Sequence, residues 1–314
     1  MKHFTAADIE RLSPYSEIVD ALAAAYRTDI VTPPRHHHTI ANTDGADATL
    51  LLMPAWRNAE AVGVKIVTVF PDNAKRGEPS VNGVYFWQDA RDGKPLASFD
   101  GAALTVRRTA GASALAARYL ARKDACTHLI VGTGAVASQL IRAHATQRPI
   151  ENIYVWGRTK SKAEAVAHAA REDGFNAEAI TDLEGAACGA DIISCATFSG
   201  EPLILGRWLK PGAHLDLVGA FKPDMRESDD EAVKRATLFC DTKATAPCEA
   251  GDLTAPIKAG VISPGAIAGD LSDLARGAHP GRTDEDEITL YKSVGAAIQD
   301  YAAADLIWRQ SHLT

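Results

Sequence analysis

The spacing of apolar residues along the chain changes near residue 124. Before that point, short runs rich in β-branched and aromatic residues are separated by turn residues, a pattern typical of a largely antiparallel sheet. These runs are residues 49–53, 62–70, 83–87 and 95–99. After residue 124, short apolar runs alternate with helical patterns, which predicts an α/β unit with a parallel sheet.

A glycine-rich turn opens this α/β part. The apolar run 128–131 leads into Gly132, Gly134 and Ala137, spaced Gly-x-Gly-x-x-Ala, and a helical pattern and a second apolar run over 152–156 follow. In dinucleotide-binding units the first glycine permits the turn, the second lets the backbone approach a pyrophosphate, and the small third residue keeps helix and strand close. An ordinary glycine turn is the alternative, but the order strand, turn, helix, strand favours a dinucleotide site.

The later apolar runs complete the expected parallel sheet and predict where a cofactor would lie. They cover residues 191–197, 213–219 and 237–241. Loops at the carboxyl ends of such strands meet the cofactor. Near the C-terminus, residues 288–295 lead into an amphipathic helix over 296–308, which we expect to return to the N-terminal part.

Cations interrupt the apolar pattern at two places in the N-terminal part. Lys65 lies in a strand with two largely apolar faces, so we expect its ammonium to point into a cleft; a snorkelling lysine on a wet face is the alternative. Arg108 lies on the apolar stripe of a predicted helix over 104–120, where a buried guanidinium needs an anionic partner. That partner is either a protein carboxylate or a ligand carboxylate. Arg107 falls further round the helix, and we expect it to be solvated.

Composition narrows the class of protein. The net charge of −7 argues against a nucleic-acid partner. The five cysteines form no Cys-x-x-Cys pair, and the chain shows neither a signal peptide nor an apolar run long enough for a membrane span. We therefore expect a reduced, cytoplasmic protein with no membrane partner. His36 and His38 would share a strand face, but no carboxylate or cysteine lies at ligand spacing, so no metal is expected.

Short motifs spread over most of the chain resemble the ornithine cyclodeaminase/mu-crystallin family. The segment Leu104-Thr105-Val106-Arg107-Arg108-Thr109-Ala110 is the most specific of them. The others are Pro34-Arg35, Met53-Pro54, Gly63-Val64-Lys65, Pro79-Ser80-Val81, Gly93-Lys94-Pro95-Leu96-Ala97, Gly132-Thr133-Gly134 and Ser293-Val294-Gly295. The resemblance implies an α/β protein: a Rossmann NAD(P)-binding domain over residues 124–288 and an α+β substrate-binding and dimerisation domain over 1–123 and 289–314. It also implies a homodimer and a small amino- or imino-acid substrate.

The resemblance assigns roles to individual residues. Lys65 and Arg108 would be catalytic, and together with Arg35 they would surround the substrate carboxylate, with Val294 at the mouth of the site. The implied cofactor contacts are Ser80, Arg108, Gly132, Gly134, Ala135, Val136, Thr197, Val218, Phe221 and Ser293.

Two departures from the family pattern select among its activities. By this resemblance, true cyclodeaminases have a glutamate at the position of Leu51 and an aspartate at the position of Phe221. The segment 219–227 instead resembles the corresponding segment of ketimine reductases, alanine dehydrogenases and mu-crystallin. Cyclising ornithine needs a carboxylate to manage the amine protons. We therefore expect an NAD(P)H-dependent reductase of 1-pyrroline-2-carboxylate or 1-piperideine-2-carboxylate. The alternatives are ornithine cyclodeaminase or alanine-dehydrogenase-like oxidation, and a non-catalytic crystallin-like ligand-binding protein.

The end of the second Rossmann strand predicts which cofactor is preferred. NAD-specific domains usually carry an acid there for the ribose hydroxyls. This chain has Arg158 and Thr159 instead, followed by Lys160 and Lys162. A guanidinium and a hydroxyl suit a 2′-phosphate, so we expect NADPH to be preferred, with NADH possible. The alternative is that these residues are simply solvated at the start of the next helix.

Overall fold

The computed structural model describes residues 1–313 and divides the chain into two compact units. The smaller unit is Met1–Arg108 with Ala296–Thr314, and the larger unit is Thr109–Gly295. These boundaries, after residues 108 and 295, differ from the predicted domain boundaries after residues 123 and 288. No helix among the described residues is long and apolar enough to cross a membrane.

The smaller unit is built on a six-stranded sheet in the order β1-β6-β5-β4-β3-β2. Its strands are β1 (Lys2–Phe4), β2 (His36–Ile40), β3 (Ala48–Arg57), β4 (Ala61–Val69), β5 (Val81–Asp89) and β6 (Pro95–Asp100), with the 3-10 helix η1 (Pro71–Arg76) between β4 and β5. Strands β2 to β6 pair antiparallel as predicted, and β1 joins β6 in parallel.

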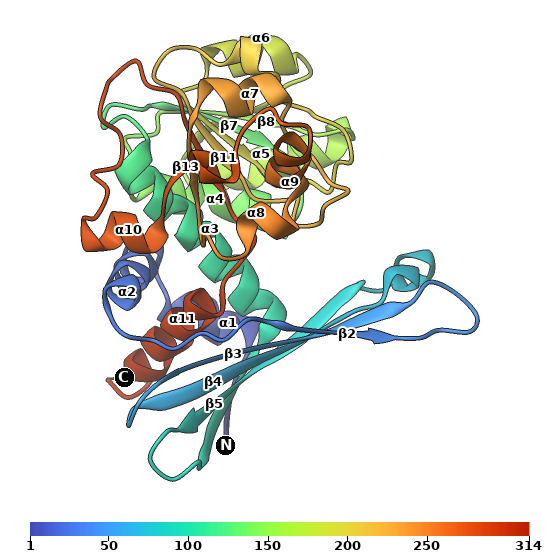
Figure 1. Ribbon diagram of the computed structural model, residues 1–314, viewed down its shortest axis with the longest axis vertical. Coiled ribbons are helices and arrows are strands. Elements are labelled where there is room, and N and C mark those ends of the chain that lie inside the picture. The colour runs from blue at the N-terminus through green and yellow to red at the C-terminus, as the bar shows by residue number, and fades with distance from the viewer. Residues whose placement is uncertain (314) are drawn as a thin grey trace. The chain divides into compact units, whose positions relative to one another are not determined.

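Helices cover one face of this sheet. They are α1 (Ala6–Leu12), α2 (Tyr15–Arg27), the first part of α3 (Gly101–Leu120) and α11 (Ala297–Gln310). Helix α11 lies against α2, β3 and β4, which confirms the predicted return of the C-terminal helix (Figure 1). Trp87 and Tyr301 pack against each other in this layer, with ring centroids 4.8 Å apart and ring planes tilted by 54°. The opposite face keeps half-exposed apolar side chains such as Leu52, Val64 and Phe86.

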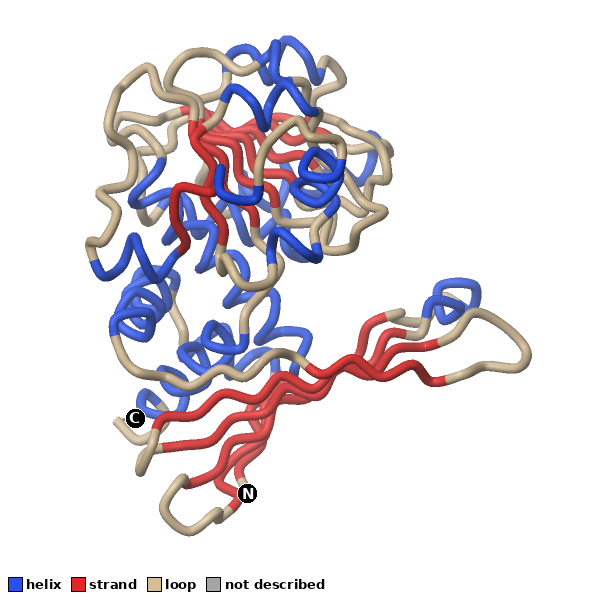
Figure 2. The backbone as a smooth tube through the Cα atoms, in the orientation of Figure 1, coloured by secondary structure: helices blue, strands red, loops and turns tan. Residues whose placement is uncertain are grey.

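The larger unit is a doubly wound sheet of eight parallel strands in the order β13-β12-β14-β11-β10-β7-β8-β9. Figure 2 shows the strands of this unit with helices on both sides. The order β9-β8-β7-β10-β11 is that of a Rossmann fold, whose switch point lies between β7 and β10. The strands are β7 (Thr127–Val131), β8 (Asn152–Trp156), β9 (Asn176–Ala179), β10 (Ile192–Cys195), β11 (His214–Leu217), β12 (Thr237–Cys240), β13 (Ile267–Asp270) and β14 (Thr289–Lys292).

The helices of this unit connect its strands. They are α4 (Ala135–Ala145), α5 (Lys160–Glu172), α6 (Leu183–Gly189), α7 (Asp230–Arg235), α8 (Ala246–Glu249), α9 (Gly251–Lys258) and α10 (Leu271–Arg276), with the 3-10 turns η2 (Gly206–Trp208) and η3 (Pro264–Ala266).

Hydrogen bonds explain why both boundaries differ from the predicted ones. The second part of α3 belongs to the larger unit because Ser113 Oγ donates to Asp216 Oδ1 at 3.0 Å, and Arg282 Nε caps the carbonyl of Leu120 at 2.7 Å. Strand β14 belongs there because it pairs in parallel with β11 on one side and β12 on the other. A strand inserted between two others cannot leave the sheet without exposing both ladders.

The glycine-rich turn has the geometry expected for it. Gly132 has φ +128°, and a Cβ there would lie 2.5 Å from the carbonyl oxygen of Ala196. Gly134 caps α4, and a Cβ on it would meet no atom within 4 Å. Ala137 is fully buried between helix and sheet. The first glycine is thus required by the protein backbone, whereas the second leaves room beside the helix N-terminus.

Candidate active site

Three buried charged side chains form an ion cluster in the smaller unit. The Nζ atom of Lys65 lies 2.7 Å from Oδ2 of Asp300, and Nε of Arg108 donates to Oδ1 of the same carboxylate at 3.1 Å. Lys65 and Arg108 are 2% and 5% exposed, and Asp300 is fully buried. The arrangement rules out a snorkelling Lys65. It also shows that Arg108 has a protein carboxylate as partner.

Arg108 is also bound by a second side chain, and one of its guanidinium nitrogens donates no hydrogen bond in the described part of the chain. Its Nη1 donates to Oε1 of Gln299 at 2.8 Å, and Nε2 of Gln299 donates to the hydroxyl of Tyr26 at 3.0 Å. Within residues 1–313, the Nη2 atom of Arg108 donates no hydrogen bond. The guanidinium is therefore fixed in orientation while its terminal Nη2 NH₂ group stays available for a ligand.

The cluster carries an excess of positive charge. Lys65 and Arg108 bring two cations against the single carboxylate of Asp300. Burial lowers the pKa of Lys65 from 10.5 to about 8; Asp300 opposes this shift, while Arg108 and the nearby Arg35 add to it. An anionic ligand would neutralise the excess charge, so a carboxylate is the kind of group this cluster suits.

Arg107, the neighbour of Arg108, has a different role. The expectation that it is solvated is wrong, because it is only 8% exposed. Its Nε donates to the carbonyl of Ser13 at 2.8 Å, and its guanidinium lies 3.9 Å from the ring centroid of Tyr15. These contacts tie α3 to the segment around α1 and α2. Adjacent arginines therefore divide into one that braces the fold and one that belongs to the ion cluster.

The other predicted residues of the smaller unit lie further along its sheet. Arg35 is half-buried just before β2, near enough to Lys65 to affect its pKa. Ser80 is half-buried just before β5, where its carbonyl accepts from the N–H of Phe70 at 2.8 Å. Leu51 lies on β3, paired with Val67 on β4. His36 and His38 are exposed on β2, and within residues 1–313 no group of three or more His, Cys, Asp or Glu side chains is arranged to hold a metal ion.

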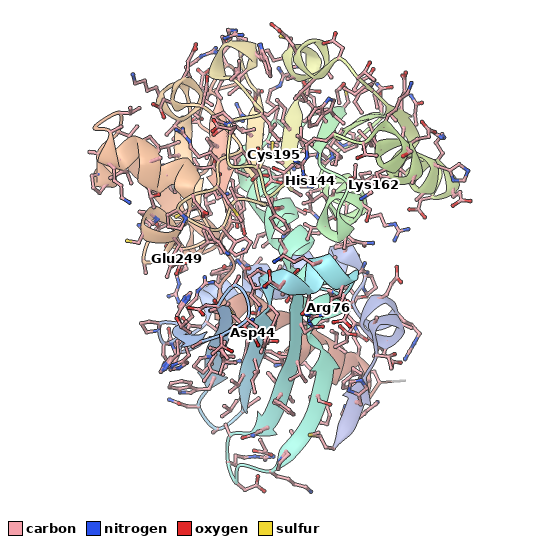
Figure 3. All side chains as sticks on the ribbon, turned by 90° about the vertical axis from the view of Figure 1, so that its right-hand side faces the viewer. Asp44, Arg76, His144, Lys162, Cys195 and Glu249 are labelled. Atoms are coloured by element: carbon pink, nitrogen blue, oxygen red, sulfur yellow. The ribbon has the colours of Figure 1, made fainter. Side chains whose placement is uncertain are left out.

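In the larger unit, the parallel sheet brings the predicted cofactor residues to one edge. They follow the carboxyl ends of five strands: Gly132, Gly134, Ala135 and Val136 after β7, Arg158 and Thr159 after β8, Thr197 after β10, Val218 and Phe221 after β11, and Ser293 and Val294 after β14. Figure 3 labels Cys195, the last residue of β10, in the interior of this unit, and Lys162 on the outer helix α5. This common edge is where ligands bind in doubly wound folds.

Two polar side chains just after the end of β8 are open to solvent. Arg158 and Thr159 are both exposed. Thr159 is the N-cap residue of α5, yet its side chain caps no backbone N–H group. Within residues 1–313, the Arg158 side chain makes no hydrogen bond or ion pair. Both groups are therefore available to an anion beside the helix N-terminus.

A buried carboxylate holds the loop after β14. Oδ2 of Asp241 accepts from the N–H of Val294 at 2.9 Å, from the N–H of Gly295 at 2.6 Å and from the hydroxyl of Ser293 at 3.2 Å. Asp241 follows β12, the neighbouring strand, and is 1% exposed. The loop that carries Ser293 and Val294 is thus fixed by the protein itself.

The sequence analysis did not single out the buried acids Asp300, in the ion cluster, and Asp241, at the loop after β14. For Asp300 a signal existed, because it falls on the same helix face as Ala297, Ala304 and Ile307, all of which are buried. A carboxylate on an apolar stripe requires a cationic partner, by the same reasoning that singled out Arg108. For Asp241 no local signal existed, since an acid at the end of a strand is usually exposed.

Comparisons with known proteins agree along nearly the whole chain. A family model described as the ornithine cyclodeaminase/mu-crystallin family matches residues 3–312. A Delta(1)-pyrroline-2-carboxylate reductase of Paracoccus denitrificans is 40% identical over 300 residues, which cover 92% of this chain and 94% of that protein. The structure of the Thermococcus litoralis Delta(1)-pyrroline-2-carboxylate reductase, in complex with NADH and L-proline, is 32% identical with a TM-score of 0.93, covering 100% of this chain and 98% of that one. An archaeal alanine dehydrogenase dimer with bound NAD is 26% identical with a TM-score of 0.91, covering 100% and 96%.

Proposed function

This chain belongs to the ornithine cyclodeaminase/mu-crystallin family, and within that family we propose that it is an NAD(P)H-dependent reductase of a cyclic ketimine. The substrate would be 1-pyrroline-2-carboxylate or its six-membered homologue 1-piperideine-2-carboxylate. The 40% identical relative from Paracoccus denitrificans and the 32% identical one from Thermococcus litoralis are both pyrroline-2-carboxylate reductases, which supports this choice.

The observation that carries the proposal is the ion cluster with its excess positive charge. Nη2 of Arg108 and Nζ of Lys65 would bind the substrate carboxylate, while Asp300 and Gln299 hold the guanidinium in place. Charge-assisted hydrogen bonds of this kind fix both position and orientation, and so decide which face of the ring is presented.

The reaction adds a hydride to the imine carbon and a proton to the nitrogen, so C=N becomes CH–NH. When bound, the reduced nicotinamide supplies the hydride. Lys65 is the protein group best suited to handle the proton, because its lowered pKa of about 8 keeps it protonated near neutral pH and makes it a stronger acid than an exposed lysine.

The larger unit fits the dinucleotide. Gly134 leaves open space at the N-terminus of α4, and the helix offers its unpaired N–H groups there. Arg158 and Thr159 would bind a 2′-phosphate, so we propose that NADPH is preferred over NADH. The remaining predicted contacts, Ala135, Val136, Thr197, Val218, Phe221 and Ser293, would line the rest of the cofactor, with Val294 toward the substrate.

The competing functions make different demands on the same residues. A cyclodeaminase needs acids where this chain has Leu51 and Phe221, and Phe221 instead packs edge-on against Phe198 with ring centroids 5.9 Å apart. A non-catalytic binding protein needs no buried cation poised at a pKa of about 8. The test is to give the purified protein NADPH with 1-pyrroline-2-carboxylate, and separately NAD with ornithine. Reduction in the first assay supports the proposal, whereas turnover only in the second contradicts it.

We also propose that the chain forms a homodimer in the cytoplasm. The half-exposed apolar face of the six-stranded sheet, with Leu52, Val64 and Phe86, is the surface that association would cover. The archaeal alanine dehydrogenase it resembles is a dimer. All five cysteines are free thiols, which suits a reducing compartment. Light scattering of the purified protein tests the dimer: a monomer at micromolar concentration contradicts it.

A further inference from the structure

One buried carboxylate joins two loops at the cofactor edge of the parallel sheet. Oε1 of Glu227 accepts from the N–H and the hydroxyl of Thr197, at 2.6 and 2.9 Å. Its Oε2 accepts from the N–H groups of Gly219 and Ala220, at 2.8 and 3.1 Å. Thr197 follows β10 and Gly219 follows β11, and these strands are neighbours. Glu227 itself is fully buried.

The two loops touch where Glu227 holds them. A Cβ on Gly219 would lie 2.0 Å from the carbonyl oxygen of Thr197 and 2.1 Å from its nitrogen. Only glycine permits that approach, which brings backbone N–H groups of both loops to one point. Without an acceptor there, these N–H groups would be buried and unpaired. The glycine and the carboxylate therefore depend on each other.

Glu227 is in turn held by a buried ion pair. Nζ of Lys292 lies 2.9 Å from Oδ2 of Asp252 and 3.7 Å from Oε2 of Glu227. Oδ1 of Asp252 accepts from the N–H groups of Glu227 and Ser228, at 2.8 and 3.0 Å. All three charged residues are fully buried. Such a network adds little net stability compared with apolar packing, so its main effect is to define geometry.

From this geometry, and on the premise of the proposed function, we infer that Glu227 is a positioning residue of the cofactor site. In a doubly wound sheet the dinucleotide lies across the carboxyl ends of the strands beside the switch point. Strand β10 borders that switch point and β11 is next to it. By holding both loops in one arrangement before binding, Glu227 removes the cost of ordering them when the cofactor arrives.

The test compares Glu227 with a matched carboxylate at the opposite edge of the same sheet. Asp191 is 8% exposed, and its Oδ2 accepts from the N–H groups of Cys126 and Thr127 at 2.9 and 3.0 Å. These residues lie at the amino ends of β10 and β7, away from the cofactor edge. Asp191→Asn thus removes a buried negative charge, with its 2.7 Å ion pair to Nζ of Lys210, without touching the proposed site.

The measurements are the thermal midpoint, the dissociation constant for NADPH by nicotinamide fluorescence, and KM against kcat. In Glu227→Gln the amide NH₂ replaces one acceptor oxygen, so one loop faces a donor instead. We expect both Glu227→Gln and Asp191→Asn to lower the thermal midpoint, whereas only Glu227→Gln raises the dissociation constant and the KM for NADPH, by about tenfold, with a smaller change in kcat. Glu227→Asp keeps the charge but has a shorter side chain, and it replaces Glu227→Gln in the test if that variant does not fold. Its dissociation constant and KM for NADPH should lie between those expected for Glu227→Gln and those of the wild type.

Two results would overturn the inference. One is NADPH binding by both Glu227 variants as tight as in the wild type; the other is an equal loss of binding in Asp191→Asn. Either would leave the proposed function intact. A wild-type protein that binds neither NADPH nor NADH would instead overturn the proposed function, and the inference with it.

Discussion

Replacing Arg108 tests whether the ion cluster binds substrate. In Arg108→Ala, Asp300 keeps its 2.7 Å pair with Lys65, but the substrate carboxylate loses the guanidinium. A charge-assisted hydrogen bond is worth roughly 1.5–3 kcal/mol, and lost positioning adds to that. We therefore expect kcat/KM to fall by about 100-fold or more, which corresponds to about 2.7 kcal/mol or more.

Arg107 provides the matched control, one residue away on the same helix. Arg107→Ala also removes a buried guanidinium, with its bond to the Ser13 carbonyl and its contact with the Tyr15 ring. Each variant leaves buried acceptors without donors, at about 1–3 kcal/mol of stability apiece, so both should lower the thermal midpoint. Only Arg108→Ala should lose kcat/KM, followed as the disappearance of reduced nicotinamide. Near-normal turnover by Arg108→Ala, or an equal loss in Arg107→Ala, would refute the reasoning.

The other predictions concern pH, the cofactor, the substrate and the turn. The pKa of Lys65 is about 8 in the folded protein against an ordinary 10.5, so the ammonium is lost as pH rises through about 8; kcat/KM should fall over that range in the wild type and not in Lys65→Met. Arg158→Ala should weaken NADPH binding about tenfold and leave NADH binding unchanged, and equal wild-type affinities for the two cofactors would contradict the 2′-phosphate role. Ornithine with NAD should yield no proline or ammonia at ordinary enzyme rates; if it does, the interpretation of Leu51 and Phe221 is wrong. Gly132→Ala should lower the thermal midpoint because its Cβ would meet a carbonyl oxygen at 2.5 Å, whereas Gly134→Ala should keep the midpoint and weaken only cofactor binding.

Local patterns were enough to predict the elements and the class of fold. Short apolar runs separated by turn residues predicted the antiparallel strands, and a Gly-x-Gly-x-x-Ala turn between strand and helix predicted the Rossmann unit. Lys65 and Arg108 stood out because a charge within an apolar pattern must be buried with a partner. These inferences succeed because periodicity and turn geometry depend on neighbours in the chain.

Only the tertiary structure decided which distant groups meet. Asp300 pairs with Arg108 across 192 residues, and Glu227 reaches Thr197 across 30. Strand β14 lies inside the larger sheet, although its sequence gave no reason to separate it from the helix that follows. Arg107 and Arg108 have the same side chain and adjacent places on one helix, yet one braces the fold and the other joins the ion cluster. Their roles differ because a helix turns about 100° per residue, so what each side chain meets is set by the packing around the helix.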